Sequence, residues 1–159
     1  MRIIRQRRIV DDSWVHAGDD DPVPPDGDVL VSLERWRSER PALLARSGRL
    51  GVRLPNTTAP AEIAGDLGHF AVVAIEFPVY RDGRGFSLAR LLRERLGYAG
   101  EIRAVGNVLR DQLFYMERCG FDAYEIQPGK SLESALEGFE DLSVTYQDAI
   151  DPRSAPRPR

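Results

Sequence analysis

A strand pattern followed by a helix pattern occurs five times along this sequence. The strand segments begin near Asp28, Gly51, Phe70, Glu101 and Ala123, and each is followed by a polar loop and a helix pattern. Successive strand–helix units pair in parallel through right-handed crossovers. The sequence therefore predicts an α/β fold with a parallel sheet.

The length of the chain restricts which parallel fold is possible. A complete (βα)8 barrel has about 250 residues, whereas this chain has 159. The five units are therefore expected to form an open parallel sheet or part of a barrel. The helix segments carry apolar residues on one side only, which favours helices packed around a curved sheet. Residues 70–77 form the most apolar strand, so we expect it at the centre of the sheet.

The two ends of the chain have a different composition from the repeated units. Residues 2–5 and 13–16 are expected to form a short hairpin with its turn at Asp11 and Asp12. Residues 18–27 are acidic and rich in proline, so a loop is expected there. The last residues have no apolar face and are expected to be disordered. The predicted regions are a hairpin with a loop at 1–27, a parallel α/β domain at 28–147 and a tail at 148–159.

The charge and hydropathy of the chain exclude several classes of partner. The formal charge is −3 and the pI is near 5.5, so the chain as a whole lacks the positive charge that binds nucleic acid. No apolar run is long enough to span a bilayer. The basic N-terminus is not followed by the apolar stretch of a secretory signal. We therefore expect a cytoplasmic protein that binds neither nucleic acid nor membrane.

Cysteine and histidine are too few for the common metal and redox sites. Cys119 is the only cysteine, so an intrachain disulfide, a CxxC pair or a four-cysteine cluster site cannot form. His16 and His69 are far apart and lack the spacing of zinc ligands. The chain has no dinucleotide or triphosphate fingerprint. We expect no metal, and no cofactor site is evident in the sequence; the alternative is a flavin, because flavin sites have no universal signature. We expect Cys119 to be a packed structural residue near a helix end.

The loop after the central strand predicts an anion site. It contains Arg81, Asp82 and Arg84 with glycines between them, and Ser87 is expected to cap the following helix. Glycines let the backbone approach a ligand, amides at a helix start attract anions, and guanidinium groups bind sulfate, phosphate or carboxylate. In the alternative interpretation, the loop is a structural turn in which Asp82 caps local amides and the arginines are solvated.

A second polar loop follows the next strand and contains Asn107, Arg110 and Asp111. Loops at the carboxyl ends of adjacent parallel strands lie side by side, so Asn107 and Arg110 are expected to join the first loop in one anion-binding pocket. Glu76 and Asp111 are candidates for acid–base groups there. The alternative is that Asn107 caps a helix and that Arg110 and Asp111 make local ion pairs.

The same loops resemble an uncharacterised bacterial family whose genes lie beside those of assimilatory sulfite reductase. The runs that carry the resemblance are Phe77-Pro-Val-Tyr-Arg-Asp-Gly-Arg-Gly-Phe-Ser, Gly106-Asn-Val-Leu-Arg-Asp-Gln and Met116-Glu-Arg-Cys-Gly-Phe-Asp-Ala-Tyr. Members are labelled probable oxidoreductases of sulfite reduction. The resemblance covers roughly residues 28–147. It implies a role in sulfur assimilation, with sulfite reductase or another enzyme of that pathway as a partner, and it implies no catalytic residue.

Two functions are consistent with these observations. The first is an accessory protein of sulfite reduction that binds an oxyanion or a partner reductase. The second is a small partial-barrel enzyme that uses Glu76, Asp82 or Asp111 as acid–base groups while arginines hold an anionic substrate. The sequence leaves open whether the protein is an enzyme, because neither loop contains a histidine and no electron carrier has a visible binding motif.

Overall fold

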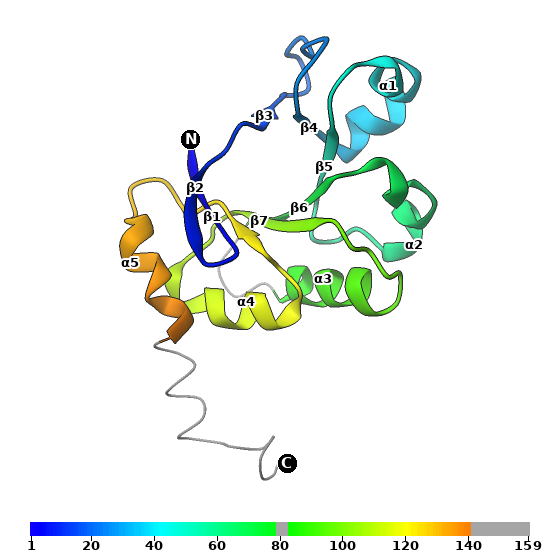
Figure 1. Ribbon diagram of the computed structural model, residues 1–159. Coiled ribbons are helices and arrows are strands. Elements are labelled where there is room, and N and C mark those ends of the chain that lie inside the picture. The colour runs from blue at the N-terminus through cyan, green and yellow to red at the C-terminus, as the bar shows by residue number, and fades with distance from the viewer. Residues whose placement is uncertain (79–82, 141–159) are drawn as a thin grey trace.

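The structure of the chain is a computed structural model, described for residues 1–78 and 83–140 (Figure 1). The strands in these residues are β1 Arg2–Arg5, β2 Arg8–Asp11, β3 Val15–His16, β4 Val29–Ser32, β5 Leu50–Leu54, β6 Val72–Phe77, β7 Glu101–Gly106 and β8 Ala123–Tyr124. The α-helices are α1 Leu33–Ala45, α2 Pro60–Ile63, α3 Arg84–Glu94, α4 Leu113–Cys119 and α5 Leu132–Leu136. Two 3-10 helices are η1 Ala64–His69 and η2 Arg110–Gln112.

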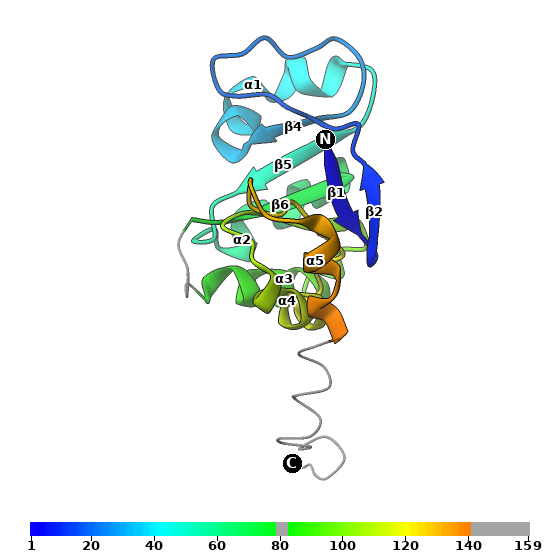
Figure 2. The same ribbon diagram turned by 90° about the vertical axis from the view of Figure 1, so that its left-hand side faces the viewer.

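One sheet contains all eight strands of the described residues, in the order β2-β1-β8-β7-β6-β5-β4-β3. Strands β3 to β8 run parallel, each beside the next in sequence, and β1 is antiparallel to both of its neighbours. The sheet curls into an open half-barrel, with the helices around its outer side (Figures 1 and 2). The expected mixture of strands and helices is confirmed, and of the two expected arrangements the chain adopts the partial barrel.

The central strand has the position that its sequence predicts. β6 pairs in parallel with β5 and with β7. Val72, Val73 and Ile75 are all at least 98% buried. A strand with side chains buried on both faces must be apolar at successive positions rather than at alternate ones, and that is why this segment was recognisable.

The predicted N-terminal hairpin was wrong in its pairing. β1 pairs with β2, residues 8–11, whereas residues 15–16 form β3, which lies parallel to β4 at the opposite edge of the sheet. The turn is at Gln6 and Arg7, whose φ angles are 52° and 63°. These angles suit a two-residue hairpin turn, but neither residue type signals one. The chain therefore has more strands than the five units and hairpin that were predicted.

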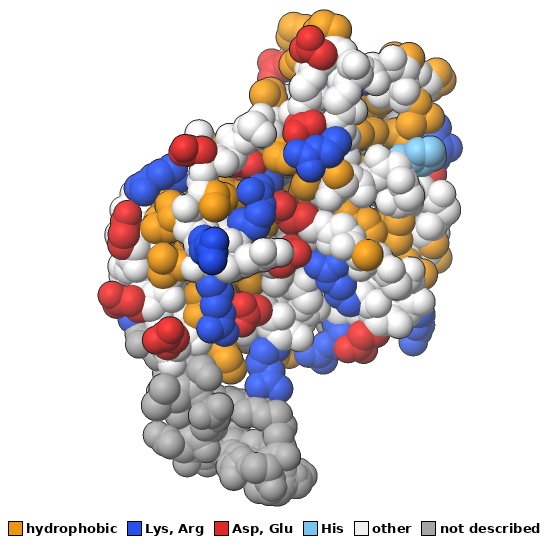
Figure 3. Space-filling view, viewed as in Figure 1, with side chains coloured by type: hydrophobic (Ala, Val, Ile, Leu, Met, Phe, Trp, Pro, Cys, Tyr) orange, Lys and Arg blue, Asp and Glu red, His pale blue; other side chains and the backbone are white. Residues whose placement is uncertain are grey.

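The main apolar core lies between the outer face of the sheet and the helices. Its largest side chains include Trp36, Phe77, Phe121 and Phe139, each at most 2% exposed. None of the helices in residues 1–78 and 83–140 is long and apolar enough to cross a membrane. The predicted tail at 148–159 lies outside the described residues. On the face seen in Figure 3, basic and acidic side chains are intermingled.

A short connection crosses the open side of the half-barrel. β2 and β3 lie at opposite edges of the sheet, and residues 12–14, the crossing segment, join them. Trp14 packs on the inner face against Leu30, Val72 and Val105. The crossing segment therefore covers part of the concave face that the helices leave open.

Candidate functional site

The concave face of the half-barrel carries charged side chains at strand positions that alternate with core residues. In β7, Ile102 and Ala104 belong to the core under the helices. Side chains alternate between the two faces of a strand, so Glu101 and Arg103 lie on the concave face. The same alternation brings Arg53 of β5 and Glu76 of β6 to this face, where they make an ion pair.

Arg103 is the centre of this charged face. Its side chain is fully buried, and it donates hydrogen bonds to Asp12 at 2.8 Å, Glu101 at 2.8 Å and Glu125 at 2.9 Å. Burial lowers the pKa of Arg103, but the three carboxylates outweigh it and raise that pKa above its ordinary value. Arg5 also donates to Glu101 at 2.8 Å and lies 3.4 Å from Asp12, so a second cation balances the acidic cluster.

His16 and Glu125 meet across the concave face, although they are 109 positions apart. The His16 Nε2 atom is 2.7 Å from the Glu125 Oε2 atom. Burial raises the pKa of Glu125, but hydrogen bonds from His16 and Arg103 outweigh it and hold that pKa below its ordinary value. An ionised carboxylate can only accept. We infer that His16 donates through Nε2, which leaves Nδ1 as the basic nitrogen when the ring is neutral.

Arg53 and Glu76 complete a cavity at the carboxyl ends of the parallel strands. The Arg53 Nε donates to Glu76 Oε2 at 2.8 Å. A cavity of about 410 Å³, which we call the mouth cavity, is lined by both residues together with His16, Glu125, Phe77 and Val105. In open parallel sheets and barrels, ligands bind at this end of the strands. The cavity therefore has the position and the charged side chains of a small-molecule site.

Gly106 shapes the rim of the mouth cavity. Its φ angle is +95°, and a Cβ atom there would lie 2.9 Å from the Phe77 carbonyl oxygen. The next residue, Asn107, donates its backbone N–H to that same oxygen at 2.8 Å. Glycine is thus required where the ends of β6 and β7 come together. The alternative in which Asn107 caps the next helix is wrong, because the N-cap residues of η2 and α4 are Leu109 and Gln112.

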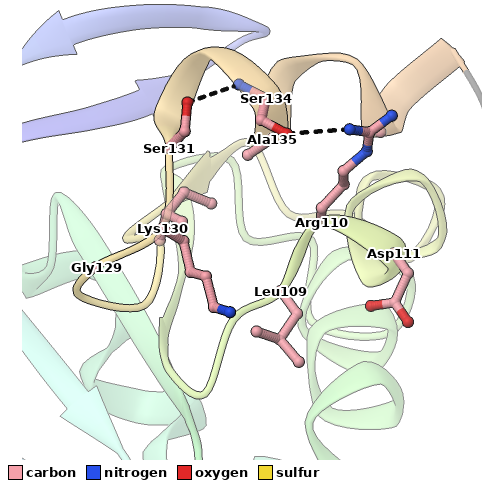
Figure 4. A pocket seen from close by; sticks show the side chains of 10 residues that line it. Leu109, Arg110, Asp111, Gly129, Lys130, Ser131, Ser134 and Ala135 are labelled. Atoms are coloured by element: carbon pink, nitrogen blue, oxygen red, sulfur yellow. Dashed lines mark hydrogen bonds between the residues drawn. The ribbon is translucent and has the colours of Figure 1, made fainter.

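The structure separates the predicted site residues into different places. Glu76 lines the mouth cavity. Arg110 and Asp111 line a different pocket of about 540 Å³, the outer pocket, between η2 and α5 (Figure 4). Arg110 is directed to α5, where it donates to Ser134 Oγ at 3.0 Å and lies 3.5 Å from Glu137. Arg110 and Glu76 therefore do not share a pocket.

The remaining predictions concern the loop before α3. α3 begins at Arg84 with Gly83 as its N-cap, so Ser87 lies inside the helix and does not cap it. The reason is that the helix starts one turn earlier than expected, with the Ser87 N–H directed to the Gly83 carbonyl. Arg84 and Ser87 are exposed. Arg81 and Asp82 lie outside the described residues.

Sequence reasoning missed His16, Arg53, Arg103 and Glu125. For Arg53 and Arg103 a signal was present, because each is a cation in the middle of an apolar strand. His16 and Glu125 offered no local signal, since their contact depends on the curl of the whole sheet. Cys119 is buried at the end of α4, with Arg90 Nη2 3.4 Å from its sulfur, as expected for a packed cysteine.

Comparison with protein families gives one match, which covers about two thirds of the chain. Residues 51–156 match the family described as bacterial protein of unknown function, DUF934. The match includes Arg53, Glu76, Arg103 and Glu125 and begins after the crossing segment and His16. No curated protein and no solved structure matches the chain. The chain belongs to the DUF934 family of bacterial proteins of unknown function.

Proposed function

We propose that this protein binds a small anionic substrate in the mouth cavity and performs acid–base chemistry on it. The observation that supports this proposal is the 2.7 Å contact between His16 and Glu125 beside Arg53. A histidine held by an ionised carboxylate is a common general base or acid in enzymes. The proposal favours the second of the two functions that the sequence left open, with His16 in place of Asp82 or Asp111.

Arg53 is the group proposed to hold the anion. Among the described residues, Glu76 is its only hydrogen-bond partner, and the bond uses Nε. The two terminal nitrogens can therefore donate to a carboxylate, sulfate or phosphate group. Its side chain is 25% exposed and that of Glu76 is 38% exposed, so a ligand can reach both. Glu76 then either receives a proton from the substrate or moves aside.

Glu125 and Arg103 are proposed as positioning residues. Glu125 accepts from His16 and from Arg103 through the same oxygen, Oε2. Arg103 is fully buried and touches neither solvent nor the cavity. The pair therefore fixes the orientation and the tautomer of His16. In many enzymes a carboxylate that is hydrogen-bonded to the catalytic histidine has this role.

The biological setting proposed for this chemistry is assimilatory sulfite reduction, and its basis is the resemblance of the loops. In that setting the anion would be a sulfur oxyanion or a carboxylate of the same pathway. An accessory role, in which the mouth cavity binds an oxyanion only when a reductase is bound, is the alternative. Neither role requires a cofactor held by this chain.

Titration calorimetry with sulfite, sulfate, phosphate and small carboxylates tests the anion site. We expect one of them to bind the wild type, and Arg53→Gln to weaken that binding about tenfold or more, because a hydrogen bond to a charged group is worth about 1.5–3 kcal/mol. Arg37→Gln is the matched control, since Arg37 makes a similar ion pair with Glu62 on the surface at 3.0 Å. Equal binding by both variants would refute the role of Arg53.

Nitrogen NMR of the His16 ring tests the acid–base assignment separately. We expect the wild type to hold its proton on Nε2 and Glu125→Gln to lose that preference. Anion binding that appears only after purified sulfite reductase is added would support the accessory role instead. A His16 ring protonated on Nδ1 in the wild type would contradict the proposed general base.

A further inference from the structure

The outer pocket is a second cavity, separate from the mouth cavity, and neither the family nor the proposed function assigns it a role. It has a volume of about 540 Å³ and lies between the loop after β7, the loop after β8 and α5. Such a volume is within the range of small-molecule sites, about 300–1,000 Å³. Leu109, Ile126 and Ala135 form its apolar wall. The pocket therefore has room for a small molecule with an apolar part.

The frame of the outer pocket is held by hydrogen bonds between its own walls. Ser131 caps α5 by accepting the Ser134 N–H at 3.0 Å, and the Ser134 hydroxyl accepts from Arg110 at 3.0 Å (Figure 4). Gly138 packs against the Arg110 carbonyl, where a Cβ atom would lie only 2.5 Å from that oxygen. The charge of Arg110 is therefore used to hold η2 against α5.

Two oppositely charged residues that line the outer pocket, Lys130 and Asp111, are not hydrogen-bonded to its walls. Neither Lys130 nor Asp111 has a side-chain hydrogen bond or ion pair anywhere in the described part of the chain. They stand on either side of Leu109 (Figure 4). Lys130 is the only lysine among 22 basic residues. In residues 1–78 and 83–140, arginines pair with carboxylates at many positions, whereas Lys130 pairs with none.

We propose that the outer pocket binds a zwitterion with an apolar body, of the class of the aliphatic α-amino acids. Asp111 accepts from the ammonium group, Lys130 donates to the carboxylate, and Leu109, Ile126 and Ala135 contact the side chain. A lysine ammonium is a compact point charge with three donors, which suits a single carboxylate. Asp111 repels a simple anion and Lys130 repels a simple cation, so the pair selects for a ligand that carries both charges.

Three ligands with the same carbon skeleton test the proposal by titration calorimetry. L-leucine carries both charges, L-leucinamide only the ammonium, and 4-methylpentanoate only the carboxylate. We expect L-leucine to bind the wild type at least tenfold more tightly than either of the others. No binding of L-leucine at millimolar concentration, or equal binding of 4-methylpentanoate, would overturn the proposal.

Single variants then assign each charge. Lys130→Gln is expected to reduce L-leucine binding at least tenfold, to the level of L-leucinamide. Asp111→Asn is expected to reduce it to the level of 4-methylpentanoate. Glu133→Gln is the control, because Glu133 of α5 lies three positions from Lys130, pairs with Arg2 and does not line the pocket. Unchanged L-leucine binding in either pocket variant would refute the assignment, and Arg53→Gln should leave L-leucine binding intact, which separates this test from that of the mouth cavity.

Discussion

The mouth cavity and the outer pocket are lined by consecutive residues after β8 but use charge in opposite ways. Glu125 lines the first and the next residue, Ile126, lines the second. In the mouth cavity each of these four side chains is hydrogen-bonded to another: His16 to Glu125, and Arg53 to Glu76. In the outer pocket, Asp111 and Lys130 have no partner among residues 1–78 and 83–140.

This difference separates two ways of preparing a site. Buried, paired charges fix the geometry of side chains, and removing one partner leaves the others in an apolar environment at high cost. Exposed, unpaired charges contribute little to the fold and remain available to a ligand. We therefore expect substitutions around the mouth cavity to lower the stability of the fold. Substitutions of the two charges at the outer pocket should mainly weaken ligand binding.

The largest loss of stability around the mouth cavity is expected from replacing Arg103, which lies buried behind it. Arg103→Met would leave Asp12, Glu101 and Glu125 close together without their shared cation. We expect the free energy of unfolding to fall by about 3–5 kcal/mol, as for other buried ion pairs that lose one partner. Urea denaturation followed by circular dichroism measures this change.

The control for Arg103 is an exposed arginine with a similar contact. Arg49 pairs with Asp28 at 2.7 Å while its side chain is 63% exposed. Arg49→Met is expected to cost at most about 1 kcal/mol. A loss below about 1 kcal/mol for Arg103→Met as well would show that the buried cluster does not stabilise the half-barrel.

A milder change tests the frame of the outer pocket. Gly138→Ala would place a methyl group 2.5 Å from the Arg110 carbonyl oxygen, so η2 and α5 must separate. Overpacking of this kind costs about 1–3 kcal/mol, and we expect a lower midpoint of urea denaturation together with weaker L-leucine binding. In Gly68→Ala the new methyl group meets no atom within 4 Å, and the midpoint should stay nearly unchanged. Equal midpoints for the two variants would contradict the tight packing at Gly138.

The smallest expected effect is on the pH dependence of stability. The pKa of Glu125 is lower in the folded protein than its ordinary value, so the unfolded chain binds more protons in the acidic range. Stability from this group is present near neutral pH and is lost as the pH falls through its folded pKa. Glu125→Gln should flatten the decline of the unfolding free energy below about pH 5. Glu94 is exposed on α3, so Glu94→Gln is the control and should follow the wild-type curve. Identical curves for all three proteins would show that Glu125 does not contribute to the pH dependence of stability.

Much of the fold was predictable because its signals are local. The apolar run of β6 indicated a central strand, and Ser32 and Ser131 each cap a helix by accepting a backbone N–H at 3.0 Å. The hairpin was not predictable, because its turn uses Gln6 and Arg7 instead of glycine or asparagine. The extra edge strand β3 has only two residues, which is too short for a periodic pattern.

The candidate site was less predictable because distant segments build it. Glu76 was recognised from its place at the end of a strand, and Asp111 and Arg110 were recognised for the same reason but lie in the outer pocket. The expected single pocket assumed that both strand-end loops face inward. In the structure the residues after β7 lie against α5, where Arg110 donates a hydrogen bond to Ser134.

The crossing segment and the adjacent His16 have a consequence for folding during synthesis on the ribosome. His16 leaves the ribosome early, whereas Glu125, its partner, follows 109 positions later. Trp14 likewise needs Val72 and Val105 to form its apolar cluster. A nascent chain, or one cut short before β8, therefore has His16 and Arg103 but lacks Glu125, the carboxylate that joins them. The proposed acid–base pair can therefore form only after the ribosome has released Glu125.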